Sequence, residues 1–128
     1  MKRDGPIRVL IADDSADVRD ALASLIGSDR ELELVAVAAD AREAVELAAR
    51  EQPGLALVDA RMPGGGGVAA AQGIAARSPQ TTIVALSASG LLPPTLEPLV
   101  SGWIVKGTRA REILSSIKCY ADSRPSPA

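Results

Sequence analysis

The chain has 128 residues and a formal net charge of -2 at pH 7, and 47% of its residues are hydrophobic. This length and composition suit one globular domain with a modest core and leave no room for a second folded unit. The slightly acidic balance, with no basic run and with Trp103 and Tyr120 as the only aromatic residues, argues against direct binding to nucleic acid.

Cysteine content and the N-terminal region bear on location. Cys119 is the only cysteine, so no internal disulfide can form, which favours a cytoplasmic location over a secreted one. The first apolar run, residues 9–12, ends in two aspartates instead of a small-residue cleavage site and is too short for a membrane span. We therefore expect a cytoplasmic protein with neither a signal peptide nor a membrane partner.

Five short apolar runs predict strands. The runs are nearly continuous in Val, Ile, Leu and Ala, which is typical of strands that are covered on both faces. They comprise residues 8–12, 34–38, 55–58, 82–86 and 103–105. Strands of this kind predict a parallel sheet.

Helical patterns alternate with these runs. Apolar residues recur with helical spacing in three segments, and an alanine-rich fourth segment is also predicted to be helical. The four segments are residues 18–26, 41–48, 68–77 and 110–117. The alternation predicts a doubly wound α/β domain with right-handed crossovers over residues 1–122, and residues 123–128 are predicted to form a Ser/Pro-rich tail or the start of a linker.

One segment, residues 88–102, breaks the alternation. It contains Pro93, Pro94 and Pro98, and a proline in a helix interior costs about 3 kcal/mol. We expect one or two helical turns at most, with Thr95 as the N-cap and Pro98 in the first turn, where its missing N–H is harmless.

Polar side chains follow four of the five predicted strands. Asp13 and Asp14 follow the first, Asp59 the third, Ser87 the fourth and Lys106 the fifth. Each has an ordinary explanation by itself, such as a helix cap for the acidic pair, a loop acid, a satisfied hydroxyl or a solvated lysine. Because the carboxyl ends of parallel strands meet at one edge of a sheet, their coincidence predicts a site there.

The residue types at this edge favour phosphoryl chemistry. Three carboxylates repel one another unless a cation joins them, and Mg²⁺, or Mn²⁺ in its place, prefers carboxylate oxygens. An aspartate beside such an ion can attack phosphorus and form an acyl phosphate. Lys106 would neutralise charge on the phosphoryl group, and Ser87 would donate a hydrogen bond to it.

The motifs, in this order, resemble the CheY-like response-regulator receiver domain, the phosphoacceptor half of two-component signalling. The stretch VLIADDS resembles the family's first strand with its acidic pair, and LVDARMPGGGG resembles its phosphorylation loop. VALSA and GWIVKG resemble the fourth and fifth strands. The resemblance covers residues 7–120 and implies a flavodoxin-like sheet with the strand order 2-1-3-4-5.

The resemblance also implies roles for individual residues. Asp59 would be the phosphoacceptor. Asp14 and Asp59 would bind Mg²⁺ directly with the backbone carbonyl of Arg61, while Asp13 would act largely through water. Lys106 would pair with the phosphoryl group.

Ser87 and Trp103 occupy the positions of the family's switch pair, in which the hydroxyl turns toward the phosphate and the aromatic ring moves inward. Trp103 has an equally good alternative explanation as a fixed hydrophobic anchor. Arg61 and Ser89 fall where the family tunes its rate of dephosphorylation.

The sequence departs from the family pattern in two places. Lysine is commonly followed there by a cis-proline, whereas Gly107 follows Lys106, so we expect a trans bond. The proline-broken segment 88–102 stands where a full fourth helix is usual, which predicts a shortened or irregular fourth helix. In the family, this region helps to form the face that dimerises or meets the output partner.

The resemblance implies a regulatory domain and not an enzyme in the usual sense, although it promotes its own phosphorylation and dephosphorylation. The expected partners are a sensor histidine kinase or a small phosphodonor, and a downstream protein or output domain. A homodimer is compatible with the resemblance. An alternative is a receiver-like module that docks a partner without being phosphorylated, which the altered fourth-helix region favours.

The glycine run suggests an alternative from another class. GGGGVA, residues 64–69, fits G-x-G-x-x-A and predicts a dinucleotide-binding enzyme. Arg61, Met62 and Pro63 intervene between Asp59 and the first of these glycines, however, and no acid ends the following strand to bind a ribose. Val68 and Ala69 also exclude a P-loop, so we expect the glycines to loosen the loop after Asp59 and not to bind a cofactor.

Overall fold

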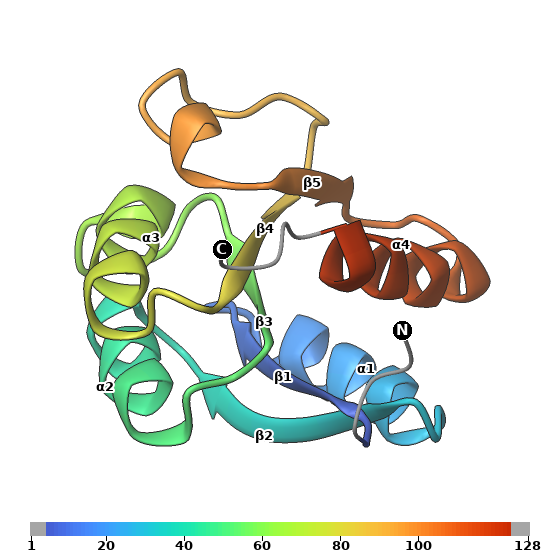
Figure 1. Cartoon of the computed structure of the whole chain (residues 1–128). Coiled ribbons are helices and arrows are strands. Elements are labelled where there is room, and N and C mark those ends of the chain that lie inside the picture. Colours follow the sequence, from blue (N-terminus) through green and yellow to red (C-terminus); the bar gives the residue numbers. More distant parts are fainter. Residues whose placement is uncertain (1–4, 124–128) are drawn as a thin grey trace.

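A computed structural model of the chain describes residues 5–123 and contains one five-stranded parallel sheet with the order β2-β1-β3-β4-β5 (Figure 1). The strands are β1 (Ile7–Ala12), β2 (Leu32–Ala38), β3 (Leu55–Asp59), β4 (Thr82–Ser87) and β5 (Gly102–Val105). The predicted sheet and strand order are confirmed. All five strands extend one or two residues beyond the predicted runs, so Asp59 and Ser87 are the last residues of their strands instead of the first residues after them.

Helices cover both faces of the sheet, α1 and α4 one face and α2 and α3 the other (Figure 1). They are α1 (Ala16–Gly27), α2 (Ala41–Glu51), α3 (Gly66–Arg77) and α4 (Ala110–Ser123). Successive strand residues point to opposite faces of the sheet and pack into two separate cores. Ile11 and Leu57 pack under α1 and α4, whereas Leu10 and Val58 pack under α2 and α3. This two-sided burial explains the continuous apolar runs in the sequence.

The first helix begins at a serine cap. The Ser15 hydroxyl accepts a hydrogen bond from the Val18 N–H at 3.4 Å, and the Ser15 backbone is extended, as expected of an N-cap. The alternative explanation of Asp13 and Asp14 as the caps of this helix is therefore wrong. Their carboxylates remain available for the edge of the sheet.

The segment between β4 and β5 contains one short 3-10 helix, η1 (Glu97–Leu99), in agreement with the predicted shortened fourth helix. Pro98 lies in its first turn as predicted, but the N-cap is Leu96 and not Thr95. The Pro93 carbonyl accepts hydrogen bonds from the N–H groups of Leu96 and Glu97, so the side chain of Thr95 is not needed as a cap. The Leu96 side chain is fully buried in the core under α2 and α3 and anchors the segment.

The irregular segment leaves one face of β5 partly open. Ile104 is buried on the face covered by α4, whereas Trp103 and Val105, which alternate with it, are 44% and 38% exposed. The last helix ends at Ser123, and the rest of the predicted tail, residues 124–128, lies outside the described residues. No helix in the described part of the chain is long and apolar enough to cross a membrane.

Candidate phosphoacceptor site

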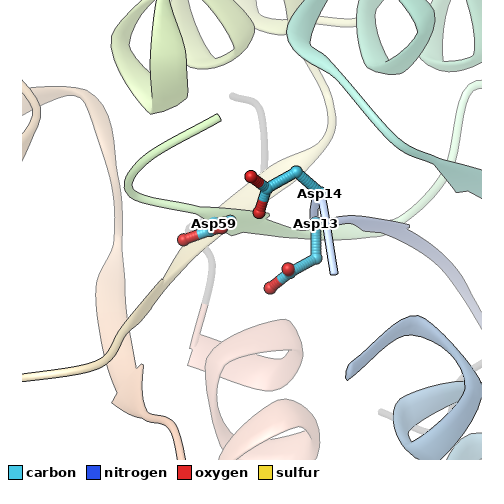
Figure 2. Close-up of side chains that lie close together, drawn as sticks. All are labelled: Asp13, Asp14 and Asp59. Atoms are coloured by element: carbon cyan, nitrogen blue, oxygen red, sulfur yellow. The ribbon is translucent and has the colours of Figure 1, made fainter. Parts of the chain in front are cut away.

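Three aspartates meet at the carboxyl ends of β1 and β3 (Figure 2). Ala12 pairs with Val58 in the parallel register, so the residues that follow these two positions emerge side by side at the same edge. One carboxylate oxygen from each of Asp13, Asp14 and Asp59 lies within 4.8 Å of the others. Asp13 and Asp59 are buried, and Asp14 is exposed.

Asp13 is held through both its backbone and its side chain. Its N–H donates to the Ala38 carbonyl at 3.1 Å, and its Oδ1 accepts the Ser15 N–H at 2.9 Å. Its Oδ2 lies 2.8 Å from the Lys106 ammonium and, among residues 5–123, has no hydrogen-bond partner of good geometry. A buried anionic oxygen that is satisfied by one ion pair alone can still accept a cation or a bridging water.

Lys106 follows β5 and reaches across the end of the sheet to both buried aspartates. Its backbone N–H donates to the Ser87 carbonyl at 2.8 Å, and its ammonium lies 2.8 Å from Asp13 and 3.3 Å from Asp59. Burial opposes the charged lysine, but these two contacts outweigh burial and raise its pKa above 10.5. The peptide bond to Gly107 is trans, as predicted, and Gly107 adopts the left-handed conformation (φ +92°) that glycine permits.

The Asp59 carboxyl group is buried among charged neighbours. Loss of solvent raises its pKa above 3.8, and the Asp13 charge acts in the same direction. The Arg61 N–H, which donates to Asp59 Oδ1 at 3.1 Å, and the Lys106 ammonium both oppose this shift and favour the ionised form. Asp59 is thus a carboxyl group with reduced hydration that lies 3.3 Å from the Lys106 ammonium.

Ser87 lies at the end of β4 with its hydroxyl engaged by the following loop. The hydroxyl donates to the Leu91 carbonyl at 2.9 Å and accepts the Gly90 N–H at 3.1 Å. These two bonds fold residues 88–91 back over the end of the strand, beside the aspartates.

The glycine run shapes the loop after Asp59. Gly64, Gly65 and Gly66 all have positive φ values, which side chains rarely adopt. Gly67 approaches so closely that an added Cβ would lie 2.8 Å from the Asp59 carbonyl oxygen, and its N–H donates to the Ala60 carbonyl at 3.2 Å. The glycines do not simply loosen this loop, because they let it close tightly against the end of β3.

Five of the predicted site residues line one cavity of about 420 Å³. Asp14, Asp59, Arg61, Ser87 and Lys106 line it, together with Ala60, Ala88, Ser89 and Leu91. Trp103 is not among the lining residues, and its pairing partner in the sheet is Ala85, two residues before Ser87. Asp13 does not line the cavity but contacts Lys106, which does, so the predicted polar groups lie together while Trp103 lies outside the cavity.

Two contacts beside the site escaped the sequence-based analysis. The Leu91 carbonyl holds the Ser87 hydroxyl, and the Arg19 guanidinium donates to the Asp13 carbonyl at 2.8 Å. A backbone carbonyl has no signature in the sequence. Arg19 could have been noticed in the sequence, because a basic residue near the N-terminus of a helix interacts unfavourably with the helix dipole unless another contact compensates.

The donor set fits a hard divalent cation. Three carboxylates from two neighbouring strands supply oxygen ligands, which Mg²⁺ prefers, and the cavity leaves room for waters and a phosphoryl group. The exposed position of Asp14 gives a cation access from solvent.

Known proteins are similar to this chain in fold and in sequence. The family model of the response regulator receiver domain matches residues 9–118. Transcriptional regulatory protein LnrK of Bacillus subtilis (strain 168) is 33% identical over 114 residues, which cover 87% of this chain and 52% of LnrK. The chain spans about half the length, or less, of the curated relatives it matches.

Two solved structures extend the comparison. The response regulator domain of Thermotoga maritima CheB has a TM-score of 0.83 and 28% identity, and the match covers 94% of this chain and 99% of that domain. The receiver domain of the sensor histidine kinase PA1611 from Pseudomonas aeruginosa PAO1, described with a magnesium ion coordinated in its active-site cleft, has a TM-score of 0.81 at 21% identity and covers 92% of this chain and 99% of its own.

The sheet order and the acidic edge define a receiver domain of the flavodoxin-like type. This chain belongs to the response regulator receiver family of two-component systems. Receiver domains are regulatory, and this chain matches the receiver portion of its relatives. The family assignment also favours phosphoacceptor signalling over the dinucleotide-binding alternative.

Proposed function

We propose that this chain is a phosphoacceptor domain that takes a phosphoryl group on Asp59 and switches protein contacts in response. The observation that carries the proposal is the position of the Asp59 carboxylate, which is buried, lines the cavity and lies 3.3 Å from Lys106. A structural ion pair would need neither the adjoining cavity nor two further carboxylates.

The side chains around the cavity are suited to phosphoryl transfer onto Asp59. An Asp59 carboxylate oxygen forms a bond to phosphorus while the bond between phosphorus and the donor's leaving group breaks, and the leaving group departs with that electron pair. Asp59 becomes an acyl phosphate. Lys106 offsets negative charge on the phosphoryl oxygens, and the Ser87 hydroxyl donates a hydrogen bond to one of them.

Asp14, Asp59 and the Arg61 carbonyl would hold Mg²⁺, with Asp13 acting through water. The ion would supply charge neutralisation for the phosphoryl group that enters the cavity. Asp13 and Lys106 already form an ion pair at 2.8 Å, which supports an indirect role for Asp13.

The proposed phosphodonor is a sensor histidine kinase or a small acyl phosphate, and the proposed recipient of the signal is an output domain or a separate protein. Ser87 and Trp103 would form the switch pair. The exposed indole of Trp103 and the loop that Ser87 holds are both near the open part of β5, where the contacts would change.

Intact mass spectrometry after incubation with acetyl phosphate and MgCl₂ tests the proposal. Wild type is expected to gain one phosphoryl group only when Mg²⁺ is present, and Asp59→Asn is expected to gain none. Asp20→Asn, which alters an exposed acid on α1, is the matched control and should behave as wild type. A folded wild-type protein that binds Mg²⁺ but gains no phosphoryl group would contradict the proposal.

That negative result would favour the second candidate, a module that docks a partner without being phosphorylated. The exposed Trp103 and Val105 beside the irregular segment are the observation in its favour. Partner binding that persists in Asp59→Ala would support it.

A further inference from the structure

Arg19 is the only basic side chain of α1, and it turns back past the start of its own helix. Its backbone N–H donates to the Ser15 carbonyl at 3.0 Å, while its guanidinium donates to the Asp13 carbonyl at 2.8 Å. A cation at a helix N-terminus costs about 0.3 to 1 kcal/mol through the helix dipole. The contact with Asp13 therefore offsets an unfavourable position instead of adding to a favourable one.

The carbonyl that Arg19 holds belongs to the peptide that joins Asp13 to Asp14. A peptide unit is planar and includes the Asp14 Cα, so a hydrogen bond that fixes the orientation of its oxygen also restrains the position of the Asp14 Cα. Asp13 has independent anchors in Ala38 and Ser15, but Asp14 is exposed and its direction depends on this peptide.

We infer that Arg19 is a positioning residue that orients Asp14 toward the cation site by holding the Asp13 carbonyl. This inference rests on the proposed function, because it concerns the same carboxylates. Arg19 itself does not line the cavity; the guanidinium acts through the backbone.

A purely electrostatic role and a positioning role for Arg19 predict opposite changes in Mg²⁺ affinity. If Arg19 contributed only its positive charge, its removal would make the acidic cluster more negative and strengthen Mg²⁺ binding. If it positions Asp14, its removal weakens Mg²⁺ binding, because groups that orient metal ligands typically change metal affinity about 10- to 100-fold.

The test is a titration of the full chain with MgCl₂, without phosphodonor, followed by amide NMR shifts of Asp13, Asp14 and Asp59. Arg19→Met should raise the Kd for Mg²⁺ about tenfold and shift the Asp14 amide in the metal-free protein, and Arg19→Lys should restore part of the affinity. Arg42→Met removes an exposed α2 guanidinium that pairs with Glu46 and should leave the Kd unchanged.

Each outcome decides a different point. Tighter or unchanged binding by Arg19→Met, with wild type binding normally, would overturn the positioning role and leave the proposed function intact. No Mg²⁺ binding by wild type would overturn both. The NMR spectrum reports folding at the same time, and Arg19→Gln provides the same test if Arg19→Met does not fold.

Discussion

The hydroxyl of Ser87 donates its hydrogen bond to the carbonyl of Leu91 at 2.9 Å. A serine hydroxyl has one proton, so it cannot donate to Leu91 and to a phosphoryl oxygen at the same time. Recruitment of Ser87 by a phosphoryl group on Asp59 would therefore release the Leu91 carbonyl and the loop that this bond closes. Leu91 is 77% exposed, so a change there would reach the surface directly.

This relationship predicts a response in the loop after β4. Addition of beryllofluoride and Mg²⁺, a mimic of the phosphorylated state, should shift the amide NMR signals of residues 88–92 in wild type. The same shifts should be largely lost in Ser87→Ala, because no hydroxyl is left to change partners. Ser24→Ala, at an exposed serine on α1 away from the cavity, is the matched control and should keep the response; an equal response in Ser87→Ala would contradict the exchange.

Trp103 provides a second reporter because it is the only tryptophan. With its side chain 44% exposed, emission in the unmodified protein should be characteristic of a partly hydrated indole. If Trp103 is a switch residue, beryllofluoride should shift the emission to shorter wavelength as the ring moves inward. Unchanged fluorescence in a protein whose loop signals do shift would identify Trp103 as a fixed residue and leave Ser87 as the sole moving element.

Lys106 should contribute to stability as well as to chemistry. In Lys106→Met, Asp13 and Asp59 lose their shared cation, which should lower the free energy of unfolding by about 1 to 3 kcal/mol in EDTA. The loss should be smaller than for a fully buried pair, about 3 to 5 kcal/mol, because the lysine side chain is 25% exposed. Added MgCl₂ should recover part of it, since a cation that binds the folded state stabilises that state.

Urea denaturation with and without MgCl₂ measures both effects. Lys118→Met is the matched control: it removes a lysine from a more peripheral ion pair with Asp29, and it should cost about 0 to 1 kcal/mol without any Mg²⁺ dependence. Equal losses for the two variants, with the same response to Mg²⁺, would show that Lys106 has no special coupling to the acidic cluster.

The tight approach of Gly67 to the Asp59 backbone predicts a steric penalty. A methyl group there would meet backbone atoms at 2.8 to 3.0 Å, and backbone cannot give way as a flexible side chain can. Gly67→Ala should therefore destabilise the protein by about 1 to 3 kcal/mol and slow phosphorylation of Asp59. Gly27→Ala, where an added Cβ meets nothing within 4 Å, should instead stabilise it by about 0.5 to 1 kcal/mol.

Thermal or urea unfolding of the two glycine variants measures these changes in stability. If Gly67→Ala were as stable as wild type, the loop after Asp59 would have a second conformation that tolerates a side chain.

Much of this site could be predicted because its chemistry is carried by side chains at strand ends. Continuous apolar runs predicted the parallel sheet, and a parallel sheet places Asp13, Asp59 and Lys106 at one edge whatever the details of the loops. Strand limits were less accurate: Glu33 interrupts the apolar pattern at the start of β2, yet Leu32 before it is buried and pairs with Ile7.

The contacts that were not predicted involve backbone acceptors. The partners of Ser87 and Arg19 are carbonyl groups of Leu91 and Asp13, and every residue carries such a group, so residue type gives no indication of which one is used. Thr95 does not act as a cap for the same reason: a backbone carbonyl, that of Pro93, already accepts the N–H groups of Leu96 and Glu97 at the start of this short helix.

The ion pair between Lys118 and Asp29 joins α4 to the turn after α1 and predicts a dependence of stability on pH. The two charged atoms lie 2.7 Å apart, and the Lys118 ammonium lies 3.6 Å from Glu31. The hydrogen bond from Lys118 lowers the pKa of Asp29 below 3.8, and the bond to Asp29 raises the pKa of Lys118 above 10.5. Both ionised forms are thus favoured by folding.

The directions of these two pKa shifts determine the pH range in which the ion pair stabilises the folded state. An acid whose pKa is lowered by folding stabilises the folded state at pH values above its unfolded pKa, and this contribution is lost as pH falls through its folded pKa. A lysine whose pKa is raised by folding loses its contribution as pH rises through its folded pKa. Asp29→Asn should therefore cost about 0.2 to 1 kcal/mol near neutral pH, and the difference from wild type should narrow below about pH 4 and in high salt. Urea denaturation at several pH values measures this difference. Asp20→Asn, at an exposed position on α1, should show no such window. A penalty for Asp29→Asn that persists in acid would show that Asp29 does not act through its charge.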